Sequence, residues 1–159
     1  NPGAGWPNKQ WPPERFGLVA RHVSRQHGWP SVVLWGPGEQ ALAGAVVAAS
    51  DGTARIAPPT GLGDVLALAR AAALVVAGDT GPLHLAAALG TPAVGIFGPT
   101  NPARNGPWSQ ADVTLSRFEQ CECHHKRRCR RSQPCVQDIG VDEVTDAVDR
   151  RCHQVTFRA

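Results

Sequence analysis

The stretch that decides the fold is ALVVAGDTGPLHLAAALGTP, residues 73–92. It begins with a short, valine-rich apolar run, as expected of a strand that is buried on both faces. A polar turn follows, in which Asp79 or Thr80 can cap a helix and a proline fits the first helical turn. Residues 83–89 are apolar nearly all round, so we expect a buried helix whose one polar side chain is His84.

The order of strand, turn and helix places Asp79 and Thr80 at the carboxyl end of a parallel strand. Ligands bind at this edge in open α/β sheets. The free backbone N–H groups of Gly81 and its neighbours would face an anion there, and the helix dipole would favour it. A capped turn without any ligand is the alternative that this stretch alone leaves open.

Length and composition indicate one globular domain, residues 1–159, with 42% hydrophobic residues. The formal charge of +3 is too small to indicate a nucleic-acid partner, and none is expected. No apolar run approaches the roughly 20 residues of a membrane helix, and no signal peptide is visible. Because methionine is absent and the chain starts at Asn1, we expect an excised segment.

Strands and helices alternate along the rest of the chain. Strands are expected at residues 31–35, 55–57, 73–77, 93–97 and 113–115, and helices at residues 14–26, 39–49, 62–69, 83–89 and 141–148. A further strand is expected to precede the loop of residues 1–13, and residues 101–109 indicate a loop or a single helical turn. The pattern predicts an α/β fold with a Rossmann-like, doubly wound parallel sheet of about six strands. No G-x-G-x-x-G follows a strand, so the dinucleotide fingerprint is absent.

Three polar turns, residues 2–9, 36–39 and 78–81, each follow a strand and should therefore share one edge of the sheet. Gly3 and Gly5 would let backbone N–H groups approach phosphates closely. If the ligand is a diphosphate leaving group, negative charge grows on it in the transition state. A cation is needed to stabilise that charge, and Lys9 can supply one. An ordinary surface lysine is the alternative.

Glu39 and His84 each have two interpretations. Glu39 heads a helix, so it could pair with the helix dipole, or its carboxylate could accept hydrogen bonds from ribose hydroxyls. His84 could be a satisfied core histidine, or a ligand or base one turn inside a helix that points at the site.

Cysteine placement suggests a reducing compartment, because the five cysteines are an odd number and cluster late in the chain among basic residues. The spacing of Cys121, Cys123, Cys129 and Cys135 differs from the C-x2-C pairs of common zinc sites, although His124 and His125 lie nearby. We therefore favour reduced thiols or a disulfide over a structural metal, and we expect no catalytic metal. The basic run of residues 124–131 indicates a solvated loop or a patch for phosphorylated or membrane-surface partners.

With these motifs in hand, the chain resembles the C-terminal half of the ADP-heptose:lipopolysaccharide heptosyltransferases, glycosyltransferase family 9, which have the GT-B fold. The resemblance rests on NPGAGWPNKQWPPERF, on the WGPGE turn, on GDTGPLHLAAALGTPAVGIFGPTNPARNGPW, and on the late cysteine-rich segment before a final helix. These stretches span nearly the whole chain, and the third is highly specific.

The resemblance implies inverting transfer of a heptose-like sugar from an ADP-sugar, which is a substrate, without a metal or other cofactor. By this likeness, Lys9 holds the donor phosphates, Glu39 binds the ribose, the backbone of Thr60 meets the adenine, and Asp79 lies near the transferred sugar. Ala4 and Gly5 stand where relatives place hydroxyl residues, so only backbone contacts remain there. The residues assigned to the phosphate-side turn and helix start are Thr80, Gly81 and His84.

The resemblance also implies partners. The general base would come from an N-terminal domain that this chain lacks, and the acceptor would be lipid-linked or an oligosaccharide of the lipopolysaccharide core type. A cytoplasmic location is expected, with peripheral association at the inner face of the inner membrane left open. Two alternatives remain: a non-catalytic nucleotide-binding module, and a transferase that uses another nucleotide sugar.

Overall fold

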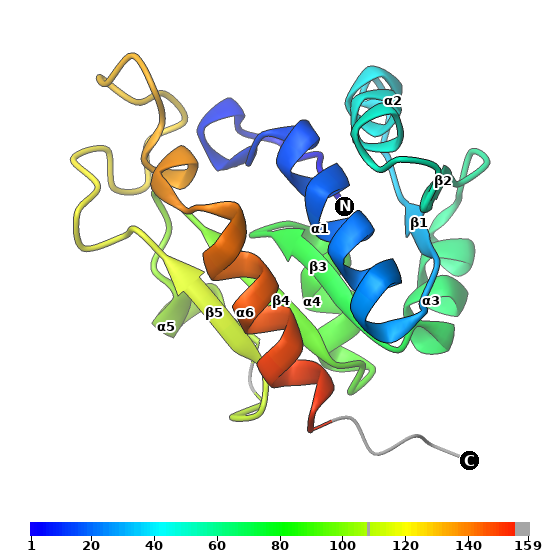
Figure 1. Ribbon diagram of the computed structural model, residues 1–159. Coiled ribbons are helices and arrows are strands. Elements are labelled where there is room, and N and C mark those ends of the chain that lie inside the picture. Colours follow the sequence, from blue (N-terminus) through cyan, green and yellow to red (C-terminus); the bar gives the residue numbers. More distant parts are fainter. Residues whose placement is uncertain (108, 155–159) are drawn as a thin grey trace.

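The computed structural model describes residues 1–107 and 109–154. Helices and strands alternate along them (Figure 1). The helices are α1 (Pro13–His27), α2 (Gln40–Ala49), α3 (Leu62–Ala71), α4 (Gly81–Ala88), α5 (Pro102–Asn105) and α6 (Val141–Cys152), with 3-10 turns η1 (Pro7–Lys9) and η2 (Cys135–Asp138). The strands are β1 (Ser31–Val33), β2 (Ala54–Ile56), β3 (Val75–Gly78), β4 (Ala93–Phe97) and β5 (Val113–Ser116).

All described strands pair in parallel, which confirms the predicted sheet type. β1 pairs with β2, and β4 lies between β3 and β5. The five strands form two hydrogen-bonded sheets, whereas the sequence predicted about six strands in a single sheet. The sixth predicted strand would precede Asn1, outside the chain. The amino nitrogen of Asn1 donates to the carbonyl of Val76 at 2.9 Å, so the N-terminal loop starts beside β3.

Helices cover both faces of the strands. α1 and α6 pack together, α6 lies on β4 and β5, and α4 lies on the other face against β3 and β4 (Figure 1). The larger core lies under α1, α2 and α6 and includes the fully buried Trp11, Val94 and Ile96. A smaller core under α4 joins Leu83 to Phe97. Burial of the five-residue strand β4 on both faces explains its continuous apolar sequence.

The expectation that the helix after Asp79 is buried all round is wrong in part. Leu83 and Ala86 of α4 are buried, but His84 and Ala88 are exposed. Apart from His84 the sequence of α4 is apolar, so its hydrophobicity does not show which side of the helix meets the sheet. The exposed face of α4 borders a cavity described below.

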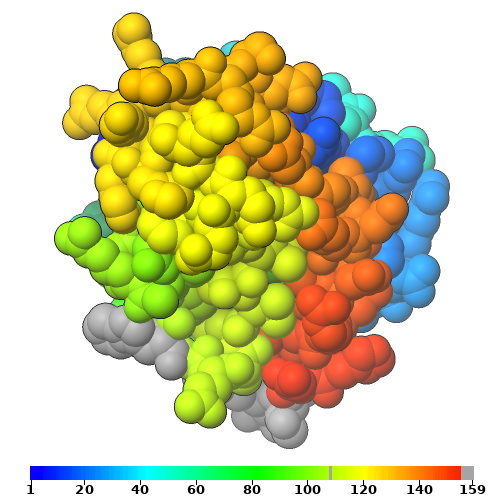
Figure 2. All heavy atoms as spheres, turned by 90° about the vertical axis from the view of Figure 1, so that its left-hand side faces the viewer, coloured from blue at the N-terminus to red at the C-terminus, as the bar shows by residue number. Residues whose placement is uncertain are grey.

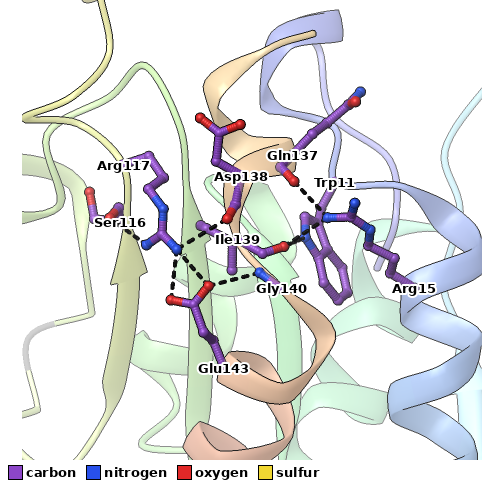
Figure 3. A network of polar contacts seen from close by, with 9 residues as sticks. All are labelled: Trp11, Arg15, Ser116, Arg117, Gln137, Asp138, Ile139, Gly140 and Glu143. Atoms are coloured by element: carbon purple, nitrogen blue, oxygen red, sulfur yellow. Dashed lines mark hydrogen bonds and ion pairs between the residues drawn. The ribbon is translucent and has the colours of Figure 1, made fainter.

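The segment that leads from η2 into α6 is held from both sides (Figure 3). On one side the Arg117 guanidinium pairs with the Glu143 carboxylate and donates to the carbonyl of Asp138 at 3.2 Å. On the other side Trp11 Nε1 and Arg15 Nη1 donate to the carbonyl of Ile139 at 2.9 and 2.8 Å. These contacts join α1, β5 and α6, so the C-terminal end of the cysteine-bearing segment is held in place at η2.

In the two described ranges, every helix is too short or too polar to cross a membrane. This agrees with the expectation from the apolar runs of the sequence.

Candidate functional site

The site is centred on an ion pair between two segments that are 70 residues apart in sequence. Lys9 ends η1, and Asp79 directly follows β3. Lys9 Nζ lies 2.6 Å from Asp79 Oδ2, and the Asp79 side chain is only 4% exposed. His84 Nε2 lies 3.0 Å from the other carboxylate oxygen, and Asn105 Nδ2 lies 3.4 Å from Oδ2. Asp79 therefore gathers the N-terminal loop, α4 and α5 around one buried carboxylate.

Asp79 is held in its charged form. Burial alone would raise the pKa of Asp79, but hydrogen bonds from Lys9 and Asn105 and the positive charge of Lys9 outweigh this effect. The pKa of Asp79 consequently lies below its ordinary value. A carboxylate of this kind can keep a lysine in place beside a bound anion without neutralising itself by protonation.

A cavity of about 400 Å³ opens on one side of this pair, and it is lined by residues of all three predicted turns. The sequence-predicted residues that line it are Gly3, Ala4, Gly5, Lys9, Glu39, Thr60, Asp79, Thr80 and Gly81. This confirms that the three turns meet at one edge, as the carboxyl ends of parallel strands require.

Glu39 packs directly against the N-terminal loop. It occupies the position before α2, and its Oε2 accepts a hydrogen bond from the backbone N–H of Gly36 at 2.9 Å. A Cβ atom at Gly3 would overlap the Glu39 carboxylate, so only glycine allows this close approach. The carboxylate is thereby fixed in the cavity wall, while its place at the helix start also favours its negative charge.

Thr80 precedes α4 but does not cap it. Its hydroxyl donates to the carbonyl of Gly78 at 3.2 Å, and no side-chain cap is present among the described residues at this helix start. The prediction that Asp79 or Thr80 caps the helix is wrong because the Asp79 carboxylate is taken up by Lys9, His84 and Asn105. The first-turn N–H groups are therefore left without a side-chain acceptor at the edge of the cavity.

A second cavity, of about 550 Å³, opens on the other side of the same ion pair. It shares Lys9, Asp79, Thr80 and Gly81 with the first cavity and adds His84, Arg104 and Asn105. The His84 side chain is 46% exposed, so the interpretation as a core histidine is wrong. The structure places His84 in this second cavity, away from the cavity that contains Glu39 and Thr60.

Sequence reasoning missed several residues of the two cavities. Trp6 lies under Lys9, whose Nζ is 4.5 Å from the ring centre, and Trp35 lines the first cavity and donates to the carbonyl of Ala57 at 2.8 Å. Asn105 ends α5, the single helical turn that follows β4. The rule that polar turns after parallel strands share one edge applies equally to this turn and could have found Asn105.

The late cysteines do not line either cavity, and they pack against one another instead. Cys121 and Cys135 form a disulfide, Cys123 Sγ lies 2.7 Å from Cys129 Sγ, and Cys121 Sγ lies 3.4 Å from Cys123 Sγ. The disulfide agrees with one of the two favoured interpretations of the sequence. His124, which was considered as a ligand, instead stacks on Phe118 and bonds to its carbonyl.

Comparison with known proteins places this geometry in context. The family model described as glycosyltransferase family 9 (heptosyltransferase) matches residues 1–135. Lipopolysaccharide heptosyltransferase 1 of Pseudomonas aeruginosa is 34% identical over 139 residues, which cover 86% of this chain and 38% of the relative. Lipopolysaccharide heptosyltransferase 2 of Escherichia coli K12 is 32% identical over 115 residues, which cover 68% of this chain and 32% of the relative.

Solved structures show the same fold. A glycosyltransferase family 9 protein from Veillonella parvula superposes with a TM-score of 0.85 at 27% identity, over 97% of this chain and 45% of the other. E. coli heptosyltransferase WaaC, solved with ADP, gives a TM-score of 0.76 at 20% identity, over 94% of this chain and 42% of the other. The chain spans less than half the length of these relatives and structures.

Proposed function

Because the chain belongs to glycosyltransferase family 9, we propose that it is the donor-binding domain of an inverting heptosyltransferase. The donor would be an ADP-heptose-like sugar, and the acceptor would be of the lipopolysaccharide core type. The observation that carries the proposal is the buried Lys9–Asp79 pair, at which two cavities meet. A nucleotide would occupy the first cavity, and the sugar would project toward the second.

The order of the turns along the strand ends fits the parts of a nucleotide sugar. From one side of the fold to the other the strands follow the order β2, β1, β3 and β4 (Figure 1). The corresponding residues are Thr60 after β2, Glu39 after β1, Asp79 after β3 and Asn105 after β4. A base at Thr60, a ribose at Glu39, phosphates at Lys9 and a sugar near Asp79 would follow this sequence.

The chemistry of the cavity wall supports this assignment. Near Thr60 the wall includes the apolar Leu62, which is 68% exposed, together with Val65. A nucleobase would cover this exposed apolar surface and so remove it from water. The opposite end combines the Lys9 ammonium with the uncapped N-terminus of α4, which is where a diphosphate is stabilised.

In the transfer step, negative charge grows on the departing diphosphate. Lys9 and the first-turn N–H groups of α4 would stabilise this charge, because they are already in place before the reaction. Asp79 would keep Lys9 in position and face positive charge that develops on the sugar ring. An N-terminal domain would supply the base that deprotonates the acceptor. It would also bind the acceptor and make the peripheral contact with the cytoplasmic face of the membrane.

Calorimetric titration of the 159-residue chain with ADP, UDP and GDP tests the proposal. We expect saturable binding of one ADP, with weaker binding of UDP and GDP. Equal affinity for the three nucleotides would overturn the ADP assignment, and absence of binding would overturn the donor-domain assignment. E. coli heptosyltransferase WaaC has been solved with ADP and with ADP-2-deoxy-2-fluoro heptose, which makes ADP the first ligand to test.

Arg104→Ala provides a matched control. Arg104 lines the second cavity and not the first, so this change should leave ADP affinity unaltered. It should lower the affinity for an ADP-sugar if the sugar enters the second cavity. Loss of ADP affinity in Arg104→Ala would show that the nucleotide lies in the second cavity instead.

A further inference from the structure

The loop of residues 119–135 is built on its cysteines. It contains no helix or strand before η2 begins, and it protrudes at the upper left of Figure 1 and forms the upper surface of the face in Figure 2. Its buried side chains are those of Cys121, Cys123 and Cys135. Cys129 is half-buried against them, and nearly every other side chain of the loop is exposed.

A segment of this kind lacks an apolar core of its own. Small units without a core are held by disulfides or by a structural metal. The sulfurs do not form two separate pairs, because Cys123 Sγ approaches both Cys121 Sγ and Cys129 Sγ and so links Cys129 to the other three. The sulfurs of Cys121, Cys123 and Cys135 all lie within 4.8 Å of one another.

We propose that, in its reduced state, this cluster binds one structural Zn²⁺ through the sulfurs of Cys121, Cys123, Cys129 and Cys135. A tetrahedral zinc site with Zn–S bonds of about 2.3 Å has sulfurs roughly 3.8 Å apart. The 3.4 Å between Cys121 and Cys123 is close to this value. The sulfurs of Cys121 and Cys135, and those of Cys123 and Cys129, would move apart as the ion binds among them.

The charge of the loop supports a metal over two disulfides. Four thiolates and one Zn²⁺ carry a net charge of −2, whereas two disulfides are neutral. The loop has five basic residues between positions 126 and 131, against acidic Glu119 and Glu122. These cations repel one another in the absence of a central negative charge, and a zinc tetrathiolate would supply it.

Sulfur ligands and cluster size select the ion. Soft thiolate ligands in a tetrahedral set favour zinc or iron–sulfur clusters. An iron–sulfur cluster places several metal and sulfide atoms between the cysteines, and the observed separations leave room for a single ion.

The binding step follows reduction of the disulfide between Cys121 and Cys135. A small dithiol donates two electrons and two protons to this bond and becomes a disulfide itself. The four resulting thiols then lose four protons to solvent as Zn²⁺ binds, because thiolates are the ligands.

The site would brace the segment that carries Lys9. Asn8 Nδ2 donates to the carbonyl of Lys126 at 2.7 Å, and the backbone N–H of His125 donates to the carbonyl of Pro99 at 2.9 Å. The guanidinium of Arg127 lies 5.9 Å from the ring centre of Trp6. Ordering the loop therefore orders the neighbouring residues 6–9, although zinc would take no part in catalysis.

The test measures zinc in the chain after purification with a reductant. We expect one Zn²⁺ per chain in the wild type and in the control Cys152→Ser, because Cys152 lies in α6, outside the cluster. Cys129→Ser removes one of four ligands, so its zinc affinity should fall by more than about 100-fold. Zinc in Cys129→Ser at the wild-type level, or iron in place of zinc, would overturn the proposal.

A measurement on the wild type alone covers the case in which the variant does not fold. Chelation and reduction are followed by titration with Co²⁺, whose tetrahedral thiolate complexes absorb strongly in the visible range. We expect a spectrum of tetrathiolate cobalt that saturates at one equivalent and is displaced by Zn²⁺. Reduced chain that binds neither ion, or a chain that keeps the Cys121–Cys135 disulfide in reductant, would contradict the proposal. These readouts do not depend on nucleotide binding.

Discussion

Lys9→Ala and Asp79→Ala should have different effects on ADP, although the two side chains form one ion pair. If Lys9 contacts the diphosphate, its removal takes away a charge-assisted hydrogen bond worth about 1.5–3 kcal/mol, or roughly 10–100-fold in ADP affinity. Asp79→Ala removes a negative charge that lies beside the anion. ADP affinity in this variant should therefore stay near that of the wild type or increase.

Lys9→Ala should also be less stable than the wild type. Removing one partner of a buried ion pair typically costs about 3–5 kcal/mol, because the other charge is left uncompensated. Since His84 and Asn105 still face the Asp79 carboxylate, we expect about 3 kcal/mol for Lys9→Ala. The exposed fractions of Lys9 and Asp79, 14% and 4%, justify treating the pair as buried.

The difference in stability between the wild type and Lys9→Ala should depend on pH. The folded-state pKa of Asp79 lies below its ordinary value, so its contribution is present above the unfolded pKa and is lost as pH falls through the folded pKa. In Lys9→Ala the lowering is reduced, so the gap between wild type and variant should shrink in acid. Urea unfolding at several pH values measures this gap.

The assay pairs calorimetric ADP titrations of both variants with turnover in the full-length enzyme. Both variants should impair transfer, and loss of one such electrostatic donor typically lowers turnover by about 10²–10³-fold. If Asp79→Ala loses ADP affinity as severely as Lys9→Ala, Asp79 only builds the phosphate turn, and its proposed role near the sugar is refuted.

Four further changes test the packing of the site and of the elements that hold it. Gly3→Ala places a methyl group on the Glu39 carboxylate, which is the end of a flexible side chain and can turn aside, so stability in urea should change by less than about 1 kcal/mol while ADP affinity falls. Gly5→Ala, with nothing within 4 Å, should keep both its stability and its ADP affinity, and equal ADP affinity of the two variants would count against this packing. Trp11→Phe removes the indole donor to Ile139 and should cost about 2 kcal/mol by thermal unfolding, and an unchanged melting temperature would contradict it. Asp149→Asn removes a carboxylate whose pKa is raised by burial but lowered further by His27 and His22; it should cost up to about 1 kcal/mol above the unfolded pKa of Asp149, and this cost should vanish as pH falls through the folded pKa.

Much of the fold was predictable because its signals are local. The strand of residues 93–97 was placed with its bounds, since a continuous apolar run between two prolines leaves little choice. Gly28 ends α1 in the left-handed conformation, with φ of 69°, as its sequence position indicated. α6 continues past the predicted Val148 to Cys152, because helix ends without glycine or proline give no local stop signal.

The site was predictable in part of its membership and not in its contacts. The rule for turns at the carboxyl ends of parallel strands brought Lys9, Glu39 and Asp79 to one edge, and the structure confirms this. The direct Lys9–Asp79 pair depends on how η1 packs against the end of β3, which no local pattern encodes. The packing of the four late cysteines against one another could not be predicted either, because an irregular loop has no periodicity from which to place its side chains.

The central claim is that a nucleoside diphosphate binds along the edge formed by the three turns. The most direct measurement follows backbone amide chemical shifts of the isotope-labelled chain during addition of ADP. The account predicts that the largest changes fall in residues 3–5, 36–39, 60–61 and 80–83. Largest changes within the basic loop of residues 119–135, or no saturable change in any of the four turn segments, would contradict it.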